Sequence, residues 1–195
     1  RFRDAFPHRN PDDTIPCAGE RANMSGIYFA HPFNAENLYF PRRADFRHVY
    51  FAGAANFENV YFAGGADFAQ AYFSDEAAFN QVQFAGVTKF DNACFATDAT
   101  FGKAQFTNLA CFRDAIFSGQ VFFSKAHFDQ DADFYCAHFS QSVDFYNAIF
   151  SENAEFDSVH FDMIVSFEKV RFVGKAYFRQ ASFDTESNFS DGAFE

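Results

Sequence analysis

The sequence contains no tryptophan, two methionines and four cysteines, and these shortages limit the kinds of protein it can encode. The cysteines stand singly at Cys17, Cys94, Cys111 and Cys136. They lack the CxxC spacing of zinc sites and are too few for a disulfide-stapled scaffold. Reduced thiols are the simpler interpretation, which favours a reducing compartment. Polar residues break every apolar stretch within a few positions, so we expect a soluble protein without a transmembrane segment.

Basic residues are scarce beyond residue 50. Residues 1–50 hold seven arginines and six acidic groups, whereas residues 51–195 hold eight basic and 20 acidic groups, a formal charge of −12. Phosphate affinity comes from lysine and arginine, so we expect no direct nucleic-acid binding by this part. The phosphate-binding glycine patterns GxxxxGK and GxGxxG are also missing.

Phenylalanine, by contrast, supplies 34 residues, and most of them follow one rule. From Phe46 to Phe194 the spacing alternates between five and six residues, so the true period is 11. Two places before each of these phenylalanines stands a small residue, which is alanine in 17 cases and valine in eight. The phenylalanines that we expect to form the structural core are Phe46, Phe51, Phe57, Phe62, Phe68, Phe73, Phe79, Phe84, Phe90, Phe95, Phe101, Phe106, Phe112, Phe117, Phe123, Phe128, Phe134, Phe139, Phe145 and Phe150.

This period fits neither a helix nor a long strand. Steps of five and six would spread phenylalanine around the circumference of an α-helix, and a step of five breaks the alternation of a plain strand. A chain that turns a corner after each short strand does fit, with the phenylalanine and the small residue pointing inward. Polar residues after each phenylalanine then form the corners.

These repeats resemble the pentapeptide-repeat family, whose units carry a small residue two places before a central leucine or phenylalanine. The resemblance covers residues 36–195 and implies an all-β, right-handed quadrilateral β-solenoid with four units per coil, about seven coils in all. The chain departs from the family pattern by one extra residue after every second unit, as at Glu76 and Val87. Two opposite corners should therefore be longer than the other two.

The two ends of the chain differ from the middle. Residues 1–35 hold four of the five prolines and lose the register, because Phe29 and Phe33 are only four residues apart. We interpret residues 1–35 as an irregular arm or cap and residues 36–195 as the solenoid. The repeat continues to Phe194 without a capping helix, and an open last coil would expose backbone for end-to-end docking with another chain.

The sequence predicts no catalytic, cofactor-binding or metal site. A catalytic triad needs a pocket, which a filled rod with flat faces does not offer. His138 and His160 occupy outward positions one coil apart, but the pattern fixes no acidic third ligand, so solvent-facing variation is the preferred interpretation.

The candidate interaction surface consists of outward aromatic and acidic residues. Tyrosines often anchor interfaces, and acidic residues recur at one outward position. The residues are Tyr39, Tyr61, Tyr50, Tyr72, Asp45, Asp67, Asp133 and Glu155. Because that position points outward, we expect Asp133→Ser to leave the stability nearly unchanged.

Two functions remain open. The first is a non-catalytic structural scaffold or protein–protein interaction module, with a subunit of a larger assembly as one form of it. The sequence does not identify its protein partner. The second follows from the resemblance: some pentapeptide-repeat proteins, including the quinolone-resistance group, present an acidic rod that type II topoisomerases such as gyrase accept in place of duplex DNA. The acidity supports this mimicry, but Lys89, Cys111 and Tyr177 interrupt the acidic column. We therefore favour the scaffold.

Overall fold

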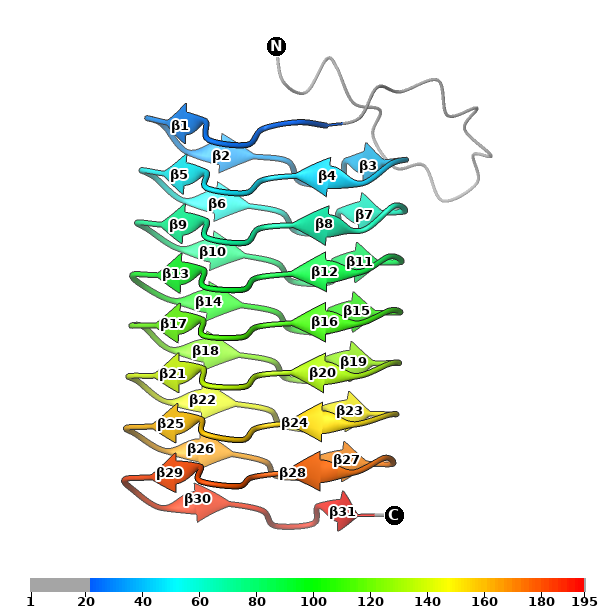
Figure 1. Cartoon of the computed structure of the whole chain (residues 1–195), viewed down its shortest axis with the longest axis vertical. Helices are drawn as coiled ribbons and strands as arrows, with labels where there is room; N and C mark the ends of the chain where they lie inside the picture. The colour runs from blue at the N-terminus through cyan, green and yellow to red at the C-terminus, as the bar shows by residue number, and fades with distance from the viewer. Residues whose placement is uncertain (1–21, 195) are drawn as a thin grey trace.

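A computed structural model describes residues 22–194, which form a rod of stacked coils with an all-β structure (Figure 1). The strands are two residues long and assemble into four parallel sheets, which we name by their first strand. Every strand pairs with the strand 22 residues away, as Tyr28 does with Tyr50. This is the quadrilateral β-solenoid that the resemblance to pentapeptide repeats implies, with four strands in each coil.

The strands of the four sheets are as follows. The β1 sheet contains β1 (Tyr28–Phe29), β5 (Tyr50–Phe51), β9 (Tyr72–Phe73), β13 (Cys94–Phe95), β17 (Ile116–Phe117), β21 (His138–Phe139), β25 (His160–Phe161) and β29 (Ser182–Phe183). The β2 sheet contains β2 (Phe33–Asn34), β6 (Ala55–Asn56), β10 (Ala77–Ala78), β14 (Ala99–Thr100), β18 (Val121–Phe122), β22 (Val143–Asp144), β26 (Val165–Ser166) and β30 (Ser187–Asn188).

The other two sheets complete each coil. The β3 sheet contains β3 (Tyr39–Phe40), β7 (Tyr61–Phe62), β11 (Gln83–Phe84), β15 (Gln105–Phe106), β19 (His127–Phe128), β23 (Ile149–Phe150), β27 (Arg171–Phe172) and β31 (Ala193–Phe194). The β4 sheet contains β4 (Ala44–Asp45), β8 (Ala66–Asp67), β12 (Thr88–Lys89), β16 (Ala110–Cys111), β20 (Ala132–Asp133), β24 (Ala154–Glu155) and β28 (Ala176–Tyr177).

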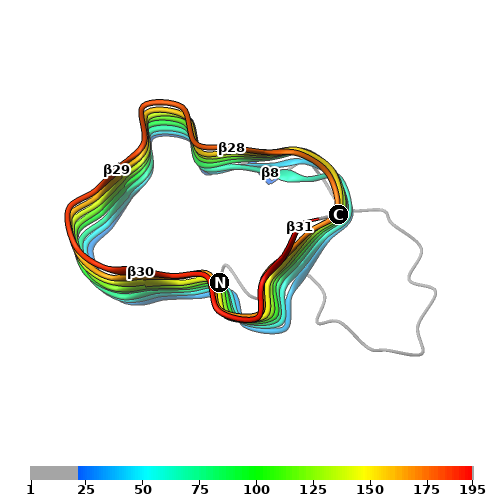
Figure 2. The same cartoon turned by 90° about the horizontal axis from the view of Figure 1, so that it is seen from below.

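The four corners of each coil are of two kinds. The five-residue steps form tight turns in which the second residue after phenylalanine has a positive φ, as at His48 (56°), and the next N–H donates back to the phenylalanine carbonyl, as from Val49 to Phe46. This is the geometry of a type II turn. The six-residue steps form the longer corners. In Figure 2 the tight turns project from the outline at two diagonal corners, between β28 and β29 and between β30 and β31.

Glycine is required at one longer corner. Gly65 has a φ of 81°, and a Cβ on its neighbour Gly64 would lie 2.3 Å from the backbone nitrogen of Arg43 in the coil above. A side chain at either position would therefore clash or strain the backbone. The pair allows the corners of successive coils to approach closely.

The core consists of four ladders of phenylalanine rings. Every phenylalanine of the 11-residue pattern from Phe46 to Phe172 is at most 1% exposed. Rings one coil apart stack face to face, as Phe57 does on Phe79 at 4.9 Å and 2°. Rings of neighbouring ladders meet edge to face, as Phe57 and Phe68 do at 5.2 Å and 85°. Each buried ring contributes about 1.5–3 kcal/mol before conformational entropy is subtracted.

Strand pairing begins before residue 36 and gives the rod about eight coils, one more than the phenylalanine spacing predicts. Phe33 pairs with Ala55 and so occupies the small-residue position, while Ala35 occupies the position of phenylalanine above Phe57. The Phe33 ring still covers the ladder, because it lies 5.1 Å from the Phe57 ring. The four-residue spacing of Phe29 and Phe33 therefore leaves the strand register unchanged. Phe33 and Ala35 exchange the small and the large inward positions.

The burial of the phenylalanine rings decreases along the last described coil. Phe178 and Phe183 are partly buried, and Phe189 and Phe194 are exposed. The proposed arm of residues 1–35 lies partly outside the described residues, as do Cys17 and the segment before Ala22. Residues 22–194 include no helix that is long and apolar enough to cross a membrane.

The exchange at the first coil predicts a compensating pair of mutations. Phe33→Ala should lower the free energy of unfolding by about 3–5 kcal/mol, because it removes a buried ring, and Ala35→Phe should destabilise by overpacking. The double variant restores the pattern of the other coils and should be more stable than either single variant. Denaturant unfolding of the three variants measures this coupling, and additive losses would contradict the exchange.

Candidate interaction surfaces

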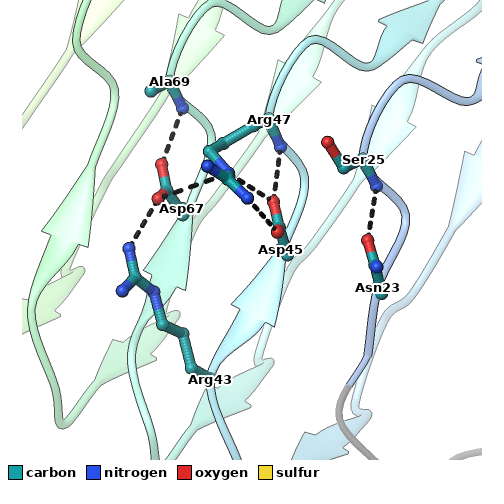
Figure 3. Close-up of polar contacts among 7 residues, drawn as sticks. All are labelled: Asn23, Ser25, Arg43, Asp45, Arg47, Asp67 and Ala69. Carbon is teal, nitrogen blue, oxygen red and sulfur yellow. Dashed lines mark hydrogen bonds and ion pairs between the residues drawn. The ribbon is translucent and has the colours of Figure 1, made fainter.

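The acidic outward position on the β4 sheet serves the turn that follows it. The column reads Asn23, Asp45, Asp67, Lys89, Cys111, Asp133, Glu155 and Tyr177 from the first coil to the last. Where the side chain carries an acceptor, it receives the N–H two residues ahead, as Asp45 does from Arg47 at 3.2 Å and Asp67 from Ala69 at 3.1 Å. Figure 3 shows these bonds and the matching bond from Ser25 to Asn23. The carboxylates therefore stabilise tight turns.

Arginines cover the two carboxylates of the first coils (Figure 3). Arg47 donates from Nε and Nη2 to the two carboxylate oxygens of Asp45 at 2.9 and 2.7 Å. Arg43 donates to Asp67 at 2.5 Å, and Arg47 lies 3.8 Å from the same oxygen. Both aspartates are 4% exposed. Arg43 and Arg47 thus neutralise the first two carboxylates of the acidic column.

The same pairing recurs farther along the rod. Arg113 Nε donates to the Asp133 carboxylate, which also accepts the Tyr135 N–H at 3.0 Å. Arg179 donates its backbone N–H and its Nε to Asp157, in the coil before it. Asp133 and Asp157 are 9% and 6% exposed. An acidic column in the sequence is therefore largely a set of covered ion pairs.

The Asp91 carboxylate departs from this pairing with arginine. Asp91 and Arg113 occupy the same turn position as Asp157 and Arg179, but Arg113 binds Asp133 instead. Asp91 Oδ1 is left buried without a hydrogen-bond partner. Burial raises the pKa of Asp91 above its usual value, against the opposing effect of Lys89. Burial also raises the pKa of the neighbouring Cys111 thiol to about 11, which makes it a poor nucleophile at neutral pH.

Tyrosines line the two opposite faces that flank this column. On the β1 sheet, Tyr28, Tyr50 and Tyr72 stack with ring centroids 5.1 and 4.9 Å apart and are 63%, 37% and 36% exposed. On the β3 sheet, Tyr39 and Tyr61 stack at 5.5 Å and are half-buried. The outward aromatic positions named from the sequence thus fall on separate faces.

His138 and His160 lie on the β1 sheet one coil apart, as the register requires. His138 Nε2 lies 2.8–2.9 Å from the Asp162 carboxylate, and His160 Nδ1 lies 2.8 Å from the Ser182 hydroxyl. Across residues 22–194, no three His, Cys, Asp or Glu side chains are placed to hold a metal ion. The pair is engaged in separate polar contacts.

The hollows of the described surface are shallow and polar. One lies over the β4 sheet and is lined by Arg113, Asp131, Glu155 and Arg179, among others. Another is lined by the turn residues Gly102, Lys103, Ser124 and Lys125 of two successive coils. Neither contains a nucleophile with an adjacent base and an oriented third group, which acyl-transfer chemistry would need.

Comparison with known proteins agrees with this geometry. The family model for pentapeptide repeats (9 copies) matches residues 101–149 and 112–159, two overlapping matches that start 11 residues apart. The match identifies the repeats of residues 101–159 as pentapeptide repeats. No curated protein matches it. The solved structure of trypsin-treated QnrB1, a plasmid-mediated fluoroquinolone resistance protein, is 14% identical to it, with 88% of this chain and 72% of that chain covered and a TM-score of 0.23.

Sequence reasoning missed the structural role of the acidic position. The expectation that Asp133→Ser would be neutral does not fit the burial of Asp133 and its two bonds. An outward side chain is not necessarily exposed, because an arginine in the coil before covers the Asp133 carboxylate. The sequence places an arginine 20 residues before Asp133 and two residues after Asp45, but these unequal separations do not show which carboxylate each arginine binds.

We predict that Asp133→Ser lowers the free energy of unfolding by about 1–3 kcal/mol, because it removes the carboxylate that pairs with Arg113 and offers the Tyr135 N–H only a shorter hydroxyl acceptor. Asp133→Asn keeps an acceptor for the Tyr135 N–H and should lose less. Asp129→Ser, at an exposed corner, is the control and should change little. Urea unfolding measures the three values, and equal stability of Asp133→Ser and Asp129→Ser would contradict the turn-capping role.

The raised pKa of Asp91 predicts that the stability of the fold depends on pH. A carboxyl whose pKa is higher in the folded than in the unfolded state binds its proton more tightly when the protein is folded. The free energy of unfolding therefore falls as the pH rises from the pKa of the unfolded state through the raised pKa of the folded state. Asp91→Asn should therefore raise the melting temperature at pH 7. The gain should shrink near pH 3, where Asp91 is protonated in both states. Thermal melts at both pH values, with Asp129→Asn as control, test this; a loss at pH 7 would contradict it.

Proposed function

We propose that this protein is a non-catalytic scaffold that binds protein partners through its flat outer faces. The filled interior supports this proposal best, because four ladders of rings occupy the space in which a solenoid could enclose a small molecule. What the rod offers a partner is its outer surface, where side chains recur at the strand spacing of about 4.8 Å.

The tyrosine columns favour a protein partner. Tyrosine is enriched in interface anchors because it offers large contact area at low entropic cost. Tyr39 and Tyr61 extend the β3 face near the first coils, and Tyr50 and Tyr72 extend the β1 face. Polar amides continue the β3 column at Gln83, so the aromatic part is confined to one end of the rod.

Mimicry of duplex DNA is the alternative function, and the net charge of −12 over residues 51–195 favours it. A basic groove recognises exposed and uncompensated negative charge. In this protein Arg43, Arg47 and Arg113 neutralise Asp67, Asp45 and Asp133, so the acidic column contributes little free charge. The ion pairs therefore shift the balance toward the scaffold.

Affinity capture from native extract tests the proposal, with the full chain as bait and mass spectrometry as readout. For a scaffold we expect a set of proteins retained at moderate salt, lost from Tyr61→Lys bait and kept by Gln105→Lys, a matched change on the same face. Type II topoisomerase subunits that leave as salt rises would support mimicry instead. Equal capture by all three baits would exclude the β3 tyrosines as the contact.

A further inference from the structure

Arg113 lies between two carboxylates, one in the coil before it and one in the coil after it. It belongs to the tight turn between β16 and β17, and the Asn92 N–H donates to its carbonyl, so the turn of Asp91 lies directly beside its own. Its Nε donates to Asp133 on β20, in the next coil. The Arg113 side chain therefore has an acceptor on either side and binds the one that follows it in the chain.

Arg179 shows the other arrangement at the same position of the repeat. Asp157 and Arg179 stand 66 residues, or three coils, after Asp91 and Arg113. Arg179 donates its backbone N–H and its Nε backward to Asp157. The backbone N–H of Arg113 is directed at the Asp91 carboxyl group in the same way. The two backbones thus match, and only rotation about the side-chain bonds of Arg113 separates the two arrangements.

Neighbouring aromatic rings account for the two choices. The Arg179 guanidinium carbon lies 5.7 Å from the ring centroid of Tyr177, which stands two residues before it. The corresponding residue before Arg113 is Cys111, which has no ring. The Arg113 guanidinium carbon lies instead 5.9 Å from the ring centroid of Tyr135, in the turn of the next coil. Cation–π contacts of this length are weak at exposed sites, so the ring favours the forward position only slightly.

The Asp91 carboxylate has room for a guanidinium donor. Its Oδ1 is buried and has no hydrogen-bond partner within the described part of the chain. The charged and titratable groups that face it are Lys89 of β12, Cys111 of β16, Asp133 of β20 and Arg113 itself. A buried acceptor without a donor costs free energy, which a hydrogen bond from the Arg113 side chain would recover.

We propose that Arg113 is a two-position switch, which binds Asp133 in one state and turns back to Asp91 when the Asp133 carboxylate is neutralised. The change replaces one guanidinium–carboxylate pair by another and gives Asp91 Oδ1 the donor that it lacks. The switch goes beyond the proposed scaffold function, because it is a property of the single chain and does not depend on whether the tyrosine faces bind a partner.

The switch sets the charge of the hollow over the β4 sheet. Arg113, Asp131, Asp133 and Glu155 line this hollow. When Arg113 turns back to Asp91, these carboxylates lose its guanidinium. The hollow then fits a cationic group, such as a lysine or arginine side chain of another protein, which itself neutralises Asp133. Binding of such a group and rotation of Arg113 therefore favour each other.

Melting temperatures of the full chain at pH 7 test the switch through Asp91→Asn in two backgrounds. In the wild-type chain this substitution should raise the melting temperature, because it removes a buried carboxylate that Arg113 does not bind. In Asp133→Asn, which keeps an acceptor for the Tyr135 N–H, Arg113 already binds Asp91. There the same substitution should lower the melting temperature by about 2–4 °C, the shift that one lost interaction causes in a chain of this size. The same sign in both backgrounds would overturn the proposal.

Arg113→Ala and Asp129→Asn are the controls for this reversal of sign. When Arg113→Ala is added to Asp133→Asn, Asp91→Asn should again raise the melting temperature, since no guanidinium remains to bind Asp91. A reversal that persists without Arg113 would contradict the switch. Asp129→Asn, at an exposed corner, should change the melting temperature in neither background. Circular dichroism confirms that each variant folds.

Nuclear magnetic resonance locates the Arg113 side chain directly. Its Nε–H signal, assigned by its absence from Arg113→Ala, should exchange slowly with solvent in the wild type, where Asp133 accepts it. Exchange should stay slow in Asp133→Asn, where Asp91 accepts it, and become at least tenfold faster when Asp91→Asn is added. Fast exchange in Asp133→Asn alone would show that the side chain turns to solvent and would overturn the switch.

Discussion

The stacking of phenylalanine at the spacing of hydrogen-bonded strands sets every other feature of this protein. Parallel strands lie about 4.8 Å apart, and rings one coil apart are 4.7 to 5.3 Å apart along the ladders. Offset-stacked aromatic rings favour centroid separations of about 4.5–7 Å, so rings held at the strand spacing stack favourably on one another. Packing at this density leaves room for little beyond Ala or Val two positions earlier. The regular recurrence of phenylalanine and a small residue in the sequence follows from this fit.

The tight turns impose the second constraint. Each five-residue step requires a positive φ, and these positions carry residues such as Asn59, Gln70 and Lys103 instead of glycine. A left-handed conformation of a residue with a side chain costs free energy. The acceptor on the strand before the turn offsets part of it by binding the N–H at the turn's first position, as Asn56 does for Glu58 at 2.8 Å. Asp and Asn in the outward columns therefore stabilise the turns that the fold requires.

The limits of prediction follow from this division. The inward pattern depends only on the period. Together with the four units per coil that the family resemblance implies, it predicts the sheets, the 22-residue coil and the two longer corners. It could not predict that Phe33 and Ala35 exchange roles, because the pattern assumes that a ring always arises from the same backbone position. Nor could it place Arg113 on Asp133 instead of Asp91. That choice depends on how a long side chain crosses between coils, which no spacing rule encodes.

The outer surface, where we propose that partners bind, therefore has to be considered coil by coil. Because every coil presents the same backbone, a partner that fits one coil fits the next equally well unless side chains distinguish them. A flat face with uniform apolar character would bind in many registers. Unique docking on such a rod requires side chains that differ from coil to coil, as the outward column of the β4 sheet does from Asp45 through Lys89 and Cys111 to Tyr177. These departures from the repeat, more than the repeat itself, are where selection for a partner would act.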